Sequence, residues 1–525
     1  MTDNTLRSCY ARLLLSSSLA FALALNGCSG SSSPTTITKG GGGGTPPPAN
    51  PVGSNLTQIS SDPYTIGPGQ HATEVEPHMI ANGSTLVAAF QTGRIAPGGA
   101  TDIGWATSTD SGKTWTHGFL PGLTTGEGSG PYDAASDPVV AYDASHQVWM
   151  IASLPLSATI ATPAVAVNRS TDGGLTWQSP VSVSLAGASS DKNWIACDTW
   201  PASPHYGNCY MEWDDPGNND RIIMSTSADG GLTWSPGVAT PSLVTGIGGQ
   251  PLVQPNGTVI VPIETFVGTS TANMSAFIST DGGATWTDPV TISTIQYHAD
   301  AGGIRSGPLP SAAIDGSGNV WVVWEDCRFR ASCTTNDLIY SISADGVNWP
   351  SPIRIPIDGT TSSVDHFIPG IGIDPATSGA SAHVALHYYY YAQTQCDVSN
   401  CQLFVGYISS ANGGGTWSNP TQITAAPMLL SWLPNSQNGL MVGDYIATVF
   451  ISGIPHGVFA VAQANSGSTF SEATYTAQGL TVAAAGNQRS SKLDRPLHKL
   501  SDAIEREVPE KRIPPLRRSA KRSAK

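Results

Sequence analysis

The feature that most constrains the fold of this chain is a segment of about eight residues that occurs in six copies. The clearest copy is Ser-Thr-Asp-Gly-Gly-Leu-Thr-Trp at positions 170–177. The copies end at Trp115, Trp177, Trp234, Trp286, Trp349 and Trp417. The steps between these tryptophans are 62, 57, 52, 63 and 68 residues. Self-similarity at a nearly constant period of this size indicates repeated supersecondary units.

The residue types of the segment predict a hairpin turn. The short Asp172 side chain can accept hydrogen bonds from backbone amides one or two residues further on. Gly173 and Gly174 can adopt positive φ at little steric cost. Trp177 then enters the next strand as a large apolar anchor with one N–H to satisfy. We therefore interpret each copy as a turn that pins its unit to the rest of the fold, and assign it no catalytic role.

The pattern Ser-x-Asp-x-Gly-x-Thr-Trp resembles the Asp box, the bacterial neuraminidase repeat of the sialidase superfamily. The fifth copy, 343–349, is one residue shorter, and Asn412 takes the place of Asp in the sixth. The resemblance implies an all-β fold, a β-propeller of four-stranded blades. It also implies that each box joins the third and fourth strands of its blade, on the face opposite the ligand site.

The length of the repeat region predicts seven blades. Residues 51–486 number 436, and the boxes recur about every 60 residues. Seven pairs of apolar segments joined by short turns support this count, although the resemblance would also allow the six blades usual in sialidases. Residues 56–60 (Leu-Thr-Gln-Ile-Ser) resemble residues 420–424 (Pro-Thr-Gln-Ile-Thr), which follow the sixth box. We therefore expect the N-terminal strand to complete the last blade and close the ring.

The segments outside the repeats indicate export. Arg7 and Arg12 precede an apolar run that ends before Cys28, so residues 1–28 read as a lipoprotein-type signal peptide with lipidation at Cys28. The run is shorter than the ~20 residues of a transmembrane helix. Residues 29–54, rich in Gly, Pro and Ser, are expected to be a flexible tether to a propeller over 55–486. We expect a lipid-anchored envelope protein, or a secreted one, that meets a membrane only through this anchor.

Charge is unevenly distributed. Residues 51–486 hold 9 Lys+Arg and 32 Asp+Glu, a net charge of −23, whereas residues 487–525 hold 12 basic and 5 acidic residues. The acidic body excludes nucleic acid as a partner. In the basic tail, Leu497, Leu500, Ile504 and Val508 are spaced as in a short amphipathic helix, and the rest is expected to be disordered. We expect a monomer.

Cysteine usage is consistent with export. Apart from Cys9 and Cys28, six cysteines remain, in three pairs that lie close in sequence. An even number in a secreted chain predicts disulfides. We predict the local pairings Cys197–Cys209, Cys327–Cys333 and Cys396–Cys401.

The starts of the first strands and the loops after the second strands should share one face of a propeller, where a ligand would bind. The charged and polar residues expected there are Glu76, Arg94, Asp102, Asp133, Asp137, Asp191, Lys192, Asp214, Asp215, Glu264, Arg305, Glu325, Asp326, Arg328, Asp365, His366, Asp444 and Tyr445. This face should therefore be crowded and mostly acidic.

The resemblance implies roles for three of these residues. Sialidases hold the sugar carboxylate with three arginines, use a Tyr nucleophile and use an Asp as acid and base. Asp102 lies where the acid/base Asp is expected, Tyr445 where the nucleophile is expected, and Arg328 matches the second clamp arginine.

Several positions depart from the sialidase pattern. Glu76 replaces the first clamp arginine, and Arg305 stands where a Glu partner of Tyr445 is expected. Arg94, in Arg-Ile-Ala-Pro, resembles the family's Arg-Ile-Pro but follows the second strand. No arginine takes the third clamp position near residues 400–403.

Three functions remain open from the sequence. The first is a glycoside hydrolase acting on glycans with acidic sugars; its catalytic residues would be Asp102, Tyr445 and Glu76, and its substrate-binding residues Arg305, Arg328, Arg94, Asp137, Asp365 and His366. The second is a glycan- or protein-binding propeller without catalysis. The third is a structural propeller with calcium at Asp133/Asp137 or Asp214/Asp215, since carboxylates suit that ion. No other metal or cofactor is expected, and serine-hydrolase, zinc-protease and P-loop motifs are absent.

Overall fold

The computed structural model describes residues 48–482, apart from 127–128, 158–161, 163, 184–188, 269–270 and 394, and also residues 488–489. The predicted signal peptide with Cys28, most of the predicted tether and the predicted amphipathic helix of the tail lie outside these residues. Within them the regular structure consists of β-strands and short 3-10 turns, so the all-β prediction is confirmed. A search of the same residues finds no helix long and apolar enough to span a bilayer.

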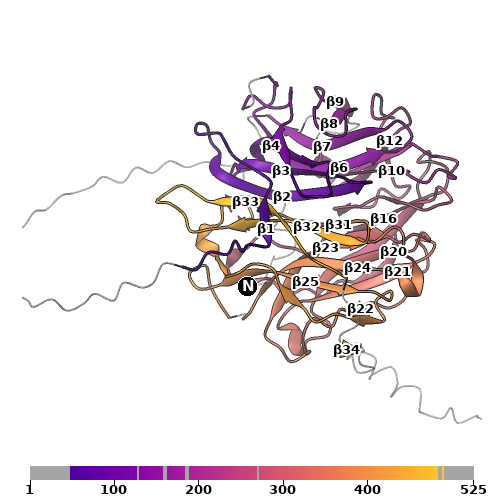
Figure 1. The fold of residues 1–525 in the computed structure, drawn as a ribbon. Helices are drawn as coiled ribbons and strands as arrows, with labels where there is room; N and C mark the ends of the chain where they lie inside the picture. The colour runs from indigo at the N-terminus through magenta and orange to yellow at the C-terminus, as the bar shows by residue number, and fades with distance from the viewer. Residues whose placement is uncertain are drawn as a thin grey trace, which may run out of the picture.

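Hydrogen-bonded pairing groups the described strands into seven antiparallel units of four strands each, and the last, first and second units are further linked into one sheet. Figure 1 shows how the strands are arranged. Unit 1 comprises β2 (Gln70–Asn82), β3 (Thr85–Arg94), β4 (Ala100–Ser108) and β5 (Thr116–Phe119). Unit 2 comprises β6 (Ala134–Asp143), β7 (Val148–Leu156), β8 (Val165–Ser170) and β9 (Val181–Val183). Unit 3 comprises β10 (Asp191–Cys197), β11 (Cys209–Asp215), β12 (Arg221–Ser227) and β13 (Val238–Ala239). Unit 4 comprises β15 (Leu252–Val253), β16 (Val259–Val267), β17 (Thr271–Ser279) and β18 (Val290–Thr294), and β14 (Gly246–Ile247) also pairs with β16.

The remaining units follow the same order. Unit 5 comprises β19 (Ser311–Ile314), β20 (Val320–Asp326), β21 (Asp337–Ser343) and β22 (Ile353–Arg354). Unit 6 comprises β23 (Asp365–Ile373), β24 (Val384–Tyr391), β25 (Gln402–Ser410) and β27 (Thr421–Gln422). Unit 7 comprises β31 (Ala447–Ile451), β32 (Ile454–Ala462), β33 (Glu472–Ala477) and β1 (Leu56–Gln58). Short strands outside the units are β26 (Thr416–Trp417), which pairs with β34 (Gln488–Arg489), β28 (Met428–Leu429), β29 (Asn435–Ser436) and β30 (Gly439–Leu440).

The two ends of the repeat region meet in unit 7. Strand β1 pairs antiparallel with β33, with Leu56 opposite Ala477. The N-terminal strand therefore supplies the fourth strand of the last unit, and the predicted pairing is confirmed. Because β33 has a partner on both sides, this unit leaves no open edge there.

The first strands of the units contact one another in a closed order. Strand β2 contacts β6, β6 contacts β10, and the series continues through β15, β19 and β23 to β31, which contacts β2. In Figure 1 units 1 and 2 lie at the top and units 5 and 6 in the lower half, with β31 and β32 between them. The starts of these first strands are therefore brought together from all parts of the chain.

The hydrophobic core is divided among the contacts between units. Seven of the eight apolar clusters in the described chain each combine residues of two consecutive units. One of them joins unit 7 to unit 1 through residues such as Val458 and Phe90. Second strands such as β3 and β7 are buried along nearly their whole length, because they pack against a neighbour on each side.

Each box starts at the last residue of a third strand and turns the chain toward the fourth. In the second box, Ser170 Oγ donates to Asp172 Oδ1 at 2.8 Å, and the amides of Leu175 and Thr176 donate to the same oxygen at 3.1 and 2.9 Å. The amides lie three and four residues beyond Asp172, so the expectation of one or two residues is wrong. The box closes a wider loop because Gly173 and Gly174, at φ 85° and 81°, turn the backbone before these amides.

The boxes also fasten each unit to the preceding one. Thr107 Oγ1 of unit 1 donates to the carbonyl of Gly174 at 2.6 Å, and Arg169 Nε of unit 2 donates to the carbonyl of Gly230 at 2.6 Å. The pinning role predicted for the boxes is confirmed at these two contacts. The three predicted disulfides, Cys197–Cys209, Cys327–Cys333 and Cys396–Cys401, are also confirmed.

Candidate functional site

The first strands of units 1, 2 and 3 each carry a β-bulge at their start. The register slips between Val75 and His78 in β2, between Ser136 and Val139 in β6, and between Asp191 and Trp194 in β10. Each bulge holds one charged residue in the left-handed region: Glu76 (φ 55°), Asp137 (φ 50°) and Lys192 (φ 47°). Such backbone is uncommon outside glycine, and bulges redirect side chains. The same left-handed backbone conformation therefore orients three charged side chains similarly relative to their strands.

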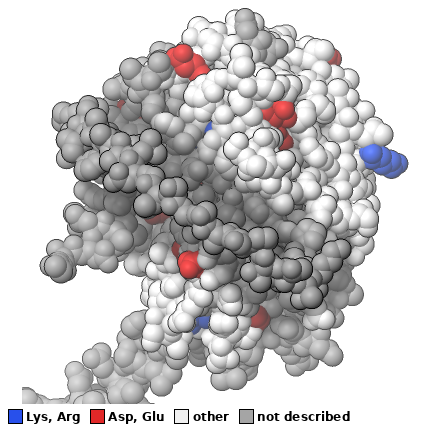
Figure 2. Space-filling view, turned by 90° about the vertical axis from the view of Figure 1, so that its left-hand side faces the viewer, with Lys and Arg blue, Asp and Glu red and all other residues white. Residues whose placement is uncertain are grey.

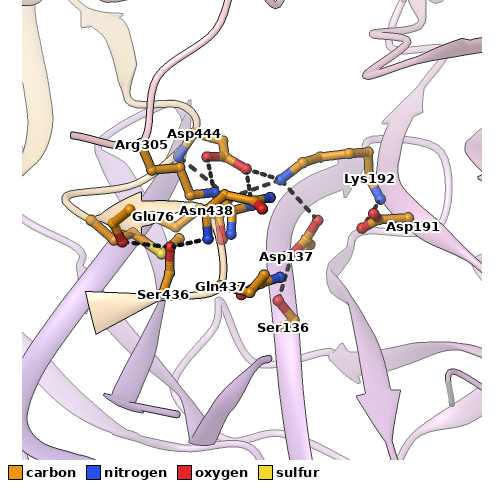
Figure 3. A network of polar contacts seen from close by, with 12 residues as sticks. Glu76, Ser136, Asp137, Asp191, Lys192, Arg305, Ser436, Gln437, Asn438 and Asp444 are labelled. Atoms are coloured by element: carbon orange, nitrogen blue, oxygen red, sulfur yellow. Dashed lines mark hydrogen bonds and ion pairs between the residues drawn. The ribbon is translucent and has the colours of Figure 1, made fainter. Parts of the chain in front are cut away.

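These side chains meet in a central polar network of Glu76, Asp137, Lys192, Arg305 and Asp444 (Figure 3). Lys192 Nζ lies 3.2 Å from Glu76 Oε1 and 3.4 Å from Asp137 Oδ2, and it also contacts Asp444. Arg305 Nε donates to Asp444 Oδ1 at 2.6 Å, and its Nη2 pairs with Oδ2. All five side chains are buried. Charged groups from several units thus lie close together and shielded from water, where electrostatic interactions are strong.

The carboxyl groups of the network differ in protonation. Burial raises the pKa of Glu76 to about 8, so this group holds its proton at neutral pH. For Asp444, burial acts in the same direction, but Arg305 and Lys192 outweigh it and hold the pKa below its usual range. Burial also raises the pKa of Asp191, next to Lys192 in the bulge, to about 6. A protonated acid therefore lies beside an ionised carboxylate, which is the pattern of acid and base pairs in enzymes.

A cavity of about 260 Å³ opens beside the network. Four residues predicted to form the site line it: Glu76, Arg94, Asp137 and Arg305. Other polar lining residues, to which the sequence assigned no role, are Gln91, Ser136, Ser189, Ser190, Asp191 and Gln437. Asp137 Oδ2 is buried, and its ion-pair partner is Lys192 Nζ at 3.4 Å. The cavity therefore combines carboxyl groups with side chains that bind hydroxyl groups.

Arg94 closes one wall of this cavity and is bonded to the protein. Its Nη2 donates to Gln437 Oε1 at 3.0 Å, its Nε lies 3.0 Å from Met441 Sδ, and its Nη1 donates to the carbonyl of Gly99. Burial lowers its pKa to about 10. Arg94 therefore braces the segment with Gln437 against unit 1.

A sequence model of the BNR repeat-like domain matches residues 83–353, which is more than half of the chain. The chain belongs to the BNR repeat-like family. The predicted resemblance to the sialidase superfamily is thereby confirmed. No curated protein matches this BNR repeat-like chain.

Several solved structures are similar to this BNR repeat-like protein at low identity. A protein of unknown function from Dyadobacter fermentans is 18% identical with a TM-score of 0.42, covering 68% of this chain and 100% of the other. The alpha-L-arabinanase of Penicillium chrysogenum, solved with arabinobiose, is 16% identical with a TM-score of 0.42, covering 82% and 99%. The Hadza microbial sialidase Hz136 is 16% identical with a TM-score of 0.40, covering 78% and 66%.

Tyr445, the predicted nucleophile, lies beneath the network rather than along this cavity. Its hydroxyl donates to the carbonyl of Pro138 at 3.0 Å, and its ring packs edge-on against Trp194 with centroids 5.2 Å apart. Burial raises its pKa well above the ordinary value. It lines a second, much smaller cavity together with Lys192 and Trp194. In this position the hydroxyl helps to hold the bulge of β6.

Asp102 and Arg328, the other two residues matched to sialidase roles, are not among those lining the 260 Å³ cavity. Asp102 is buried in β4, where it accepts a hydrogen bond from the Tyr64 hydroxyl at 3.1 Å. Arg328 Nη2 pairs with Asp326 at 2.6 Å, and its Nη1 donates to Ser293 Oγ at 2.6 Å. Arg328 thus connects β20 to the end of β18, in the neighbouring unit.

Asp365 and His366 at the start of β23 belong to two other polar clusters, between units 5 and 6. Asp365 Oδ2 lies 3.1 Å from His298 Nδ1, and His366 Nε2 lies 3.9 Å from Asp358 Oδ2. Burial lowers the pKa of His366. Neither residue lines the 260 Å³ cavity.

Two groups in the described part of the chain could hold a metal ion: His298, Asp300 and Asp365, and Asp337, Asp358 and His366. The pairs proposed from the sequence as calcium ligands, Asp133/Asp137 and Asp214/Asp215, are not part of either group. In the central network the place of a cation among the carboxylates is taken by the Lys192 ammonium group.

Proposed function

We propose that the chain is a seven-bladed β-propeller, with units 1–7 as its blades and the central polar network near its axis. The proposal is supported by the closed order of contacts among the first strands and by the seven apolar clusters between consecutive units. Radial repetition of blades leaves only short, protected sheet edges, which is a general advantage of propellers. Six blades would leave one of the seven four-stranded units without a place.

We propose further that the protein is a glycoside hydrolase with Glu76 and Asp137 as its catalytic carboxyl groups. The observation that carries this proposal is that both groups line one cavity, one of them with its pKa raised to about 8 by burial. Glu76 would protonate the glycosidic oxygen. Asp137, through its Oδ2 atom 3.4 Å from Lys192 Nζ, would activate water or attack the anomeric carbon. Proton transfer of this kind contributes roughly 10²- to 10⁴-fold to a rate.

The lining of the cavity supports recognition of sugar hydroxyl groups. Gln91, Ser136 and Gln437 offer amide and hydroxyl groups, and the volume of about 260 Å³ lies just below the roughly 300 Å³ at which ligand pockets begin, so that it suits a small group such as one sugar unit. Arg305 is bonded through two nitrogens to Asp444, so a sugar carboxylate would have to displace that partner. We therefore propose a neutral sugar unit at the cavity, and keep the acidic sugar predicted from the sequence as the alternative that the same assay tests.

The assay is hydrolysis of a panel of fluorogenic glycosides, with neutral α- and β-linked sugars and an α-sialoside. Wild type is compared with Glu76→Gln, Asp137→Asn and Tyr445→Phe. We expect turnover of a neutral glycoside that falls at least 100-fold in the first two variants and much less in Tyr445→Phe. Asp110→Asn is the matched control, because it makes the same carboxylate-to-amide change in a box and Asn already occupies that place at Asn412. Turnover that depends on Tyr445 but not on Glu76 would restore the sialidase mechanism.

A second candidate function is glycan binding without turnover. The observation that favours it is that one ammonium group, Lys192 Nζ, contacts both Glu76 and Asp137, so neither carboxyl group is independent of it. In this case wild type would hydrolyse nothing in the panel and would retain specific glycans on an array. Loss of that retention in Gln437→Ala or Gln91→Ala would locate the binding at the cavity.

We also propose that the protein is exported and anchored through a lipid on Cys28. The three disulfides support export, since such bonds persist in oxidising compartments. Growth of a bacterial host with a labelled fatty acid tests the anchor. Label should appear on the wild-type chain and be lost in Cys28→Ser.

A further inference from the structure

A second polar cluster, separate from the cavity, lies between units 5 and 6. His298 and Asp300 belong to the segment before β19, Asp365 begins β23, and one ligand atom from each lies within 4.8 Å of the others. His298 Nδ1 is 3.1 Å from Asp365 Oδ2. Glu325, at the end of β20, accepts a hydrogen bond from the amide of Ile368 in β23, the strand that Asp365 begins.

The cluster brings buried carboxylates together with too little positive charge. Glu325 and Asp365 are fully buried, and Glu325 Oε1 accepts no hydrogen bond. Buried charges without a partner are costly, and a bound cation would remove that cost.

The neighbouring group of Asp337, Asp358 and His366 provides an internal comparison. Arg330 Nη2 lies 2.5 Å from Asp337 Oδ1 and 2.7 Å from Asp358 Oδ1, and Arg354 Nη2 lies 2.8 and 2.5 Å from the same two atoms. Two guanidinium groups therefore already stand among these carboxylates. This group needs no metal ion, in contrast to the cluster around Asp365.

Hydrogen bonds hold Asp365 and Glu325 so that one oxygen of each stays open, whereas Asp300 accepts hydrogen bonds at both oxygens, from Asn336 Nδ2 and Ser306 Oγ. The amide of Asn336 donates to Asp365 Oδ1 at 2.6 Å, which leaves Oδ2 directed at His298. The amide of Ile368 donates to Glu325 Oε2 at 3.0 Å, which leaves Oε1 without a donor. Backbone and side-chain partners of this kind orient the ligands in metal sites.

We propose that His298, Asp300 and Asp365 bind a divalent transition-metal cation. One imidazole nitrogen and carboxylate oxygens, without a thiolate, form a ligand set suited to Zn²⁺ or Mn²⁺, and the imidazole disfavours Ca²⁺. The proposal is independent of the proposed hydrolysis.

The bound ion would tie the segment before β19 to unit 6. The same segment carries Arg305, which pairs with Asp444 in the central polar network. Binding of the ion would therefore stabilise the fold at this place and hold one wall residue of the cavity, without touching a ligand there.

The test uses the full chain without an affinity tag, treated with a chelator and dialysed. Zn²⁺, Mn²⁺ and Ca²⁺ are then titrated separately by calorimetry, and the melting temperature is measured with each ion. We expect one Zn²⁺ or Mn²⁺ per chain, a raised melting temperature, and affinity at least tenfold lower in His298→Gln and Asp365→Asn. His146→Gln is the matched control, because His146 also pairs with a buried aspartate, Asp143, at 2.6 Å but has no further carboxylates in a ligand group.

Three results would overturn the proposal. They are no saturable binding of Zn²⁺ or Mn²⁺, binding of Ca²⁺ alone, and binding that is undiminished in His298→Gln. If Asp365→Asn does not fold, His298→Gln alone tests the proposal. The His298 side chain is 26% exposed, and its replacement by Gln leaves the buried carboxylates in place.

Discussion

Lys192 is the residue on which the central polar network depends, because its ammonium group lies among carboxylates from three separate parts of the chain. In Lys192→Met, Asp137 and Asp444 would remain buried with only Arg305 to balance their charge. Removal of one partner from a buried ion pair costs about 3–5 kcal/mol. We expect the free energy of unfolding, measured with urea, to fall by about that amount.

Lys113→Met is the control for this variant. Lys113 is exposed in the first box and forms no ion pair among the described residues, so the same substitution there should change the free energy of unfolding by less than about 0.5 kcal/mol. Equal effects of the two substitutions would contradict the account of the network.

At the same scale the sequence predicted part of the site. Glu76 and Asp137 are each followed by proline, and a charged residue before proline at the start of a first strand is a readable sign of a bulge. Lys192 is followed by Asn193 and lacks that sign, although it was expected on the same face. That Lys192 reaches Glu76 and Asp137 depends on left-handed backbone at all three positions, which sequence patterns do not reveal.

At the scale of the element, the box is a loop closed by one acidic side chain. The hydrogen bonds to Asp172 from two amides and from the Thr176 hydroxyl, at 2.6 Å, lower its pKa to about 2 despite the opposite effect of burial. In Asp172→Ala these bonds are lost, and we expect the free energy of unfolding to fall by about 1 kcal/mol. In Asp172→Asn the free energy of unfolding should fall by less.

The sixth box justifies that comparison. Asn412 Oδ1 accepts a hydrogen bond from the amide of Thr416 at 2.8 Å, and Asn412 Nδ2 donates to the Thr416 hydroxyl at 2.8 Å. An amide can therefore replace the carboxylate in this loop. Thermal melting of the two Asp172 variants checks the order, and an Asn variant less stable than the Ala variant would be inconsistent with it.

The sequence located the boxes but not their hydrogen bonds. Six copies of one pattern were enough to place each turn between a third and a fourth strand. The choice of amides three and four residues on depends on positive φ at both Gly173 and Gly174, and the sequence shows only that glycine permits this.

At the scale of the whole molecule, β1 links the first described residues to the last unit. Ile59, which follows this strand, is buried in the cluster between units 7 and 1. A chain that starts at Asp62 would expose the edge of β33 and part of that cluster. We expect its melting temperature to be several degrees below that of a chain starting at Pro51, which retains β1. Equal melting temperatures would show that this pairing does not stabilise the ring.

The whole fold was more predictable than the site because six copies of one motif all indicate the same kind of unit, so an error in interpreting one copy changes little. Residues 56–60 and 420–424 resemble each other, and this similarity was enough to predict that the N-terminal strand completes the last unit. The sialidase roles given to Asp102, Tyr445 and Arg328 stay predictions. The structure places these residues in other contacts, and the cavity instead collects Glu76, Arg94, Asp137 and Arg305.

The most direct test of Glu76 as the general acid is the pH dependence of kcat/KM for wild type and Glu76→Gln on the glycoside of the panel that wild type hydrolyses fastest. This ratio reports the free enzyme, in which burial raises the pKa of Glu76 to about 8. Because protonated Glu76 is the active form, wild-type kcat/KM should fall as pH rises through about 8. Glu76→Gln should be at least 100-fold slower at pH 6 and lack this alkaline limb. The same alkaline limb at similar rates in both proteins would contradict Glu76 as the general acid.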